Sequence, residues 1–173
     1  MSNFGPMIAE SAQLALGYAE RLLKDVTPEQ FARFAKVGDT VIQSNHPAFI
    51  YGHLSLYACR VVEGCGQDAS SLQPSEDFER AFSKDAQCVD DTEGSIYPPM
   101  DVVTKAFFDG YGAAVEALKQ APDDVFTKEN PNEAMRGKFP TQGGLFDFYV
   151  GGHVMLHIGQ LSAWRRAIGL GPA

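Results

Sequence analysis

Four long stretches of the chain repeat apolar side chains every three or four residues, the spacing of a helix that buries one face. In this chain of 173 residues they cover positions 6–22, 47–63, 99–121 and 142–168. No comparable stretch shows the apolar and polar alternation of a half-buried strand, and no internal repeat is evident. The spacing therefore predicts an all-α fold in which four helices pack as a four-helix bundle.

Prolines and glycines mark the ends of these stretches. Pro47 and Pro99 stand where a first helical turn begins, a position that tolerates proline, whereas Pro122 and Gly169 end their helices. A short helical turn is expected from Pro28 to Phe34, after Thr27 as its cap.

A long irregular connection separates the second and third expected helices. Residues 65–97 hold several glycines and prolines and an acidic excess at Asp85, Asp90, Asp91 and Glu93. A short helix is expected only from Asp77 to Phe82. The acidic run is most simply a solvated surface, and a connection of this length commonly covers or shapes a site.

The size and charge of the chain narrow its function class. Its length and a hydrophobic content of 45% suit one domain over residues 1–173. Fourteen basic residues stand against 22 acidic ones, for a net charge of -8. Because the basic residues are scattered, we expect neither nucleic acid nor an anionic membrane as the main partner.

Cysteine usage and the lack of a leader segment indicate a cytoplasmic protein. Cys59, Cys65 and Cys88 are odd in number and form no C-x-x-C motif, so they are expected as reduced thiols rather than as a disulfide framework. The N-terminus has no basic region followed by an apolar core. No window approaches the 18 or so apolar residues of a membrane span.

Histidines near the C-terminus are the strongest chemical signal. His153 and His157 are four residues apart, so on a helix they share one face and can bind one divalent ion. Two ligands do not make a tight site, and His53 lies inside the apolar stripe of another expected helix. His46 precedes a proline and is expected as a cap or rim residue. The alternative is that these histidines only pack.

Residues around the histidine pair fit a functional site. Gln160 lies three residues beyond His157, where its side chain can hydrogen-bond a ligand. Tyr149 is a candidate proton donor, with packing as the simpler alternative. Gly151, Gly152 and Gly159 favour close packing or open space on this helix.

Two familiar metal chemistries do not fit the motif. A zinc peptidase of the H-E-x-x-H type needs a glutamate where Val154 stands. A di-iron bundle needs a glutamate three residues before each histidine, and neither His153 nor His157 has one. A neutral three-histidine site remains. It suits zinc or nickel and can lower the pKa of a bound water or thiol.

Two motifs resemble the DinB/YfiT-like superfamily of bacterial metal-binding helical bundles. One is Tyr51-Gly52-His53-Leu54; the other runs from Gly152-His153 to His157-Ile158-Gly159-Gln160-Leu161. The likeness spans nearly the whole chain by helix order, with specific identity confined to these motifs. The long connection at 65–97 departs from the usual pattern. The resemblance assigns one divalent metal ion to three ligands: His53, His153 and His157.

This resemblance implies a thiol-dependent enzyme. Characterised members are transferases that use low-molecular-weight thiols such as bacillithiol or mycothiol, and a mycothiol-dependent isomerase. Two other classes stay open: a metal-dependent hydrolase that activates water, and a non-enzymatic metal-binding stress protein or dimeric module. The resemblance also implies a homodimer, for which the faces of Tyr57, Gln160 and Trp164 are candidates.

Overall fold

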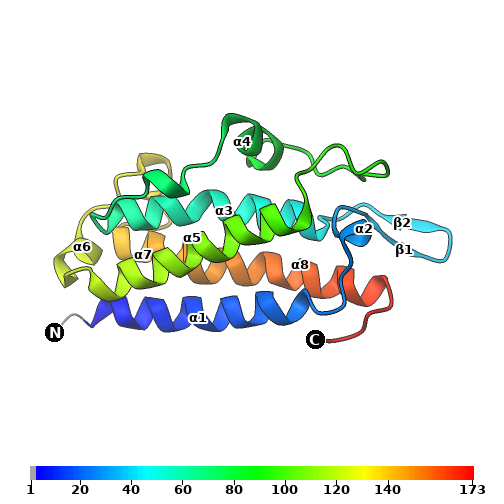
Figure 1. Cartoon of the computed structure of the whole chain (residues 1–173). Helices are drawn as coiled ribbons and strands as arrows, with labels where there is room; N and C mark the ends of the chain where they lie inside the picture. Colours follow the sequence, from blue (N-terminus) through cyan, green and yellow to red (C-terminus); the bar gives the residue numbers. More distant parts are fainter. Residues whose placement is uncertain (1–2) are drawn as a thin grey trace.

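The computed structural model describes residues 3–173 and is mostly helical, so the prediction of a mainly α-helical chain is confirmed. The four longest described helices are α1 (Phe4–Leu22), α3 (Pro47–Gly64), α5 (Met100–Gln120) and α8 (His153–Ala167). They lie side by side along their lengths (Figure 1). Helix α5 packs on α1 and α3, and α8 packs on the same two helices.

Shorter elements connect these helices. They are α2 (Pro28–Phe31), the 3-10 turn η1 (Ser70–Leu72), α4 (Glu76–Phe82), α6 (Asp123–Thr127), the 3-10 turn η2 (Glu133–Met135), α7 (Gln142–Asp147) and the π-helical segment η3 (Phe148–Gly152). None of the helices described between residues 3 and 173 combines the length and apolar composition needed to cross a membrane.

A small β-hairpin was not expected from the sequence. Strand β1 (Ala35–Val37) pairs antiparallel with β2 (Thr40–Ile42), and Figure 1 shows the hairpin projecting beyond the long helices. Strands of three residues are too short to show an alternating pattern. Gly38 has φ +58, a conformation that glycine adopts without strain and that allows the tight reversal. The expectation that no strands form is therefore wrong for this segment.

The last predicted helix is divided by a change in helical geometry. One helix was expected over 142–168, but η3 separates α7 from α8 with π-helical turns. Such turns are rare and often lie at functional sites. The buried hydroxyl of Tyr111 donates to the carbonyls of Leu54 and Tyr149, both at 3.2 Å. This phenol thereby joins α3 to η3, directly before His153.

Loop 65–97 is fastened to the helices by its acidic residues. Asp90 forms a bidentate ion pair with Arg33, with nitrogen–oxygen distances of 2.9 and 3.1 Å. Asp91 is buried and accepts backbone N–H bonds from residues 95, 96 and 97. The prediction of a solvated acidic surface is wrong for these two carboxylates, because backbone and guanidinium donors replace water around them.

The three cysteines form no disulfide within the described chain, as predicted. Burial raises the pKa of each thiol, to about 11 for Cys65 and Cys88. These thiols therefore stay protonated near neutral pH. A protonated, buried thiol is a poor nucleophile.

Candidate metal centre

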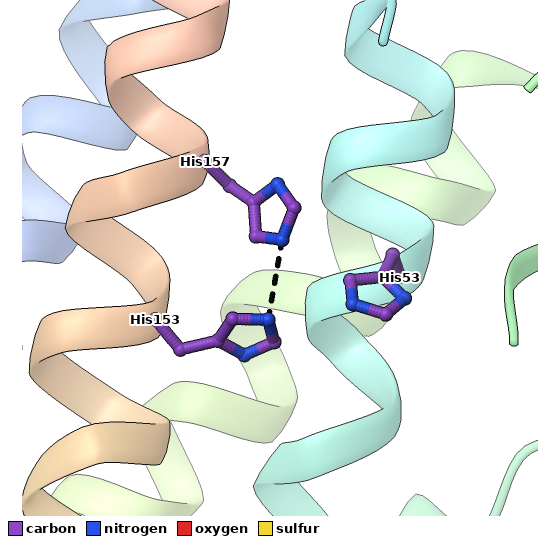
Figure 2. A group of neighbouring side chains, drawn as sticks. All are labelled: His53, His153 and His157. Atoms are coloured by element: carbon purple, nitrogen blue, oxygen red, sulfur yellow. Dashed lines mark hydrogen bonds between the residues drawn. The ribbon is translucent and has the colours of Figure 1, made fainter. Parts of the chain in front are cut away.

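Three histidines from two helices meet inside the protein. His53 comes from α3, whereas His153 and His157 lie one turn apart on α8 (Figure 2). One nitrogen from each side chain can be chosen so that all three lie within 4.8 Å of one another. Each side chain is less than a tenth exposed. The structure thus brings together all three residues that the sequence singled out.

The outer nitrogens of two histidines are fixed by hydrogen bonds. His53 Nδ1 lies 2.9 Å from the Phe82 carbonyl oxygen, and His157 Nδ1 lies 2.9 Å from Gln160 Oε1. Because both oxygens only accept, each Nδ1 carries a proton and each Nε2 keeps a free lone pair. Asn45 Nδ2 also donates to Gln160 Oε1, at 3.4 Å. Partners of this kind orient metal-binding histidines.

His153 is the least satisfied member of the group. Its Nε2 lies 3.2 Å from His157 Nε2, and its Nδ1 is buried without a hydrogen-bond partner in the described chain. Tetrahedral coordination of zinc by nitrogens at 2.0–2.1 Å sets two ligand nitrogens about 3.4 Å apart. The 3.2 Å separation of the two Nε2 atoms, which the dashed line in Figure 2 joins, is close to that value. His153 and His157 therefore have the spacing of two ligands of one small divalent ion, and His53 lies close enough to be the third.

The environment keeps the histidines neutral. Burial lowers the pKa of all three, and the neighbouring imidazoles help to lower that of His153 to about 3. The Arg60 charge contributes to the lowered pKa of His53, after burial. Neutral imidazole is the form that binds metal. Because no carboxylate belongs to the cluster, a bound ion would keep its full positive charge.

His46 has a structural role. Its Nδ1 accepts from the Phe49 amide at 3.2 Å and caps the start of α3, while its Nε2 donates to the Val89 carbonyl at 2.9 Å. Both ring nitrogens are therefore occupied, and His46 does not join the other three histidines. The prediction of a cap residue is confirmed.

A cleft of about 910 Å³ opens beside the histidines. Residues 83–88 form part of its wall, so the long connection does shape the site as expected. Tyr149 lines the cleft, and its ring packs 5.0 Å from that of Tyr57. The Tyr57 ring in turn lies 4.7 Å from the His153 ring. The cleft gives small molecules access to the cluster.

Some functional residues were missed or assigned differently from the sequence. Tyr57, Gln160 and Trp164, the candidates for a dimer face, each have partners within the chain, and the dimer stays a prediction. Phe82 was not singled out, because it contributes a backbone carbonyl, and a carbonyl carries no side-chain signal. Arg60 was not singled out either.

Neither the protein-family models, nor the curated proteins, nor the solved structures that were compared contain a match to this chain. Function therefore has to be inferred from the site itself. Its decisive features are a cluster of three neutral imidazoles, two of them oriented by hydrogen bonds, and a cleft that reaches the cluster.

Proposed function

We propose that this protein is a metal-dependent enzyme built as a four-helix bundle of the DinB/YfiT-like type, with thiol S-transferase as its reaction class. The observation that carries the proposal is the convergence of His53, His153 and His157 on one point beside an open cleft. The four long helices that pack around the core are compatible with such a bundle. Zinc and nickel both suit three imidazole ligands.

Different residues of the chain would bind the metal ion and orient its ligands. His53, His153 and His157 would hold the ion, and the Phe82 carbonyl and Gln160 fix the orientation of two of them. A divalent ion held by neutral ligands lowers the pKa of a thiol or water at its open position. The cleft admits the substrate and gives the site a partly apolar wall.

The nucleophile would have to come from outside the chain. Cys59 and Cys65 are buried, and Cys88, which is half-buried and lines the cleft, has its pKa raised by burial to about 11. A protein thiol is therefore poorly suited to attack an electrophile at neutral pH. A small thiol cosubstrate that enters the cleft meets the requirement. The homodimer that the resemblance implies is also part of this proposal. Light scattering on the purified protein measures the molar mass that tests it.

The experiment that tests the proposal uses protein loaded with cobalt(II), whose visible spectrum reports on its ligands. We expect a small thiol to produce a sulfur-to-cobalt absorption band, and to be required for turnover of an electrophile such as an epoxide. The His157→Ala variant should show neither effect. Hydrolysis of an activated ester without thiol, and no sulfur band, would identify a hydrolase instead. If the wild-type protein showed neither activity and no sulfur-to-cobalt band, a non-enzymatic protein would remain.

A further inference from the structure

Three side chains with hydrogen-bond donors lie next to one another in the wall of the cleft. Tyr57, Arg60 and Tyr149 all line it. The Arg60 guanidinium lies 5.1 Å from the centre of the Tyr57 ring, in a cation–π contact, and so leans back along α3 towards the histidines. The Tyr57 ring contacts both Tyr149 and His153, at 5.0 and 4.7 Å between ring centres. These donors therefore form one continuous group with the candidate metal centre.

None of these donors has an acceptor in the described chain. The two phenol hydroxyls make no hydrogen bond to a described residue, and Arg60 forms no ion pair with one. Glu79 and Asp85 also line the cleft, yet neither carboxylate lies within ion-pair distance of Arg60. A guanidinium presents a planar fork of N–H groups that matches a carboxylate, and phenol O–H groups can add to it.

From this geometry we propose that Tyr57, Arg60 and Tyr149 form a subsite for the carboxylate of a small organic anion. The inference rests on the proposed function, since the subsite would hold the thiol cosubstrate by its charged group beside the metal centre. Arg60 follows His53 by two helical turns, which correspond to a rise of about 10 Å, and its side chain leans back over part of that length. A thiol in which two carbons separate the sulfur from the carboxylate suits this spacing.

The test compares two thiols of equal length that differ in charge. 3-Mercaptopropionate carries the carboxylate and 3-mercapto-1-propanol does not. Their dissociation constants are measured by calorimetry on cobalt-loaded protein, while the visible spectrum reports sulfur binding separately. 2-Mercaptoethanesulfonate, with a tetrahedral anionic group, shows whether the subsite prefers a planar carboxylate.

We expect the carboxylate thiol to bind about tenfold more tightly than the alcohol, and Arg60→Met to abolish that difference. Arg60→Lys should keep only part of it. Arg21→Met is the matched control, because Arg21 also lies over a tyrosine ring, that of Tyr18, but on α1 away from the cleft. This control should retain the full preference.

The two proposals fail separately in this experiment. Equal binding of the carboxylate and the alcohol, or a preference that persists in Arg60→Met, would overturn the anion subsite even if the sulfur band forms. A preference lost in Arg60→Met without any sulfur band would support the subsite and refute the thiol chemistry. Tighter binding of the sulfonate than of the carboxylate would overturn the assignment of a carboxylate ligand.

Discussion

Replacing Gly52 by alanine tests how closely α3 and α4 must approach to orient His53. An added Cβ at Gly52 would lie 2.4–2.5 Å from three ring carbons of Phe82, whereas ordinary contacts begin at 3.4 Å. Phe82 has no exposed surface and is packed against Phe78 and Tyr97. The ring must therefore move by about 1 Å, and overpacking of this kind costs about 1–3 kcal/mol.

The helix-forming preference of alanine offsets part of this cost, by about 1 kcal/mol. We expect Gly52→Ala to lower the free energy of unfolding by up to about 2 kcal/mol, measured by urea denaturation. Because the Phe82 carbonyl binds His53 Nδ1, metal affinity should also fall by about tenfold or more.

Gly112→Ala on α5 is the matched control. A Cβ added at Gly112 would have no neighbouring atom within 4 Å, and the residue is exposed, so this change should raise the free energy of unfolding by up to about 1 kcal/mol. If Gly52→Ala proved as stable as Gly112→Ala and bound metal as tightly as the wild type, the close approach of Phe82 and its orienting role would be refuted.

Two further predictions concern the histidines. Gln160→Met removes the acceptor of His157 Nδ1, so metal affinity should fall about 10- to 100-fold in competition with a chelating dye; unchanged affinity would contradict the orienting role. Because burial lowers the pKa of His153 to about 3 in the folded state, the unfolded chain binds more protons between about pH 6.5 and about pH 3, and the metal-free protein should lose stability as the pH falls from about 7 to about 3. Urea titrations at several pH values should show that His153→Gln loses less stability than the wild type as the pH falls. The same dependence of stability on pH in both proteins would argue against a buried neutral imidazole.

The local pattern of the sequence predicted much of the site. His153 and His157 share a helical face because of their spacing alone, and His53 was placed inside by the apolar residues around it. His46 was recognisable as a cap because proline follows it. These predictions depend on neighbours within a few residues, where helical geometry is well determined.

Features that depend on distant parts of the chain were not predictable in the same way. The Phe82 carbonyl reaches His53 only because the irregular 65–97 connection folds back over α3. The π-helical turns of η3 have no apolar period of their own, and the Tyr111 hydroxyl that binds the Tyr149 carbonyl there comes from another helix. Arg60 became a candidate anchor only once the cleft beside it was known.

The central claim is that α3 and α8 together hold one metal ion through His53, His153 and His157. Elemental mass spectrometry on protein purified without a histidine tag tests it most directly. We predict close to one zinc or nickel ion per chain in the wild type, its loss in His53→Ala and His157→Ala, and its retention in His46→Asn, which keeps a capping residue. Wild-type protein that contains no metal and takes up neither zinc nor nickel would contradict the account.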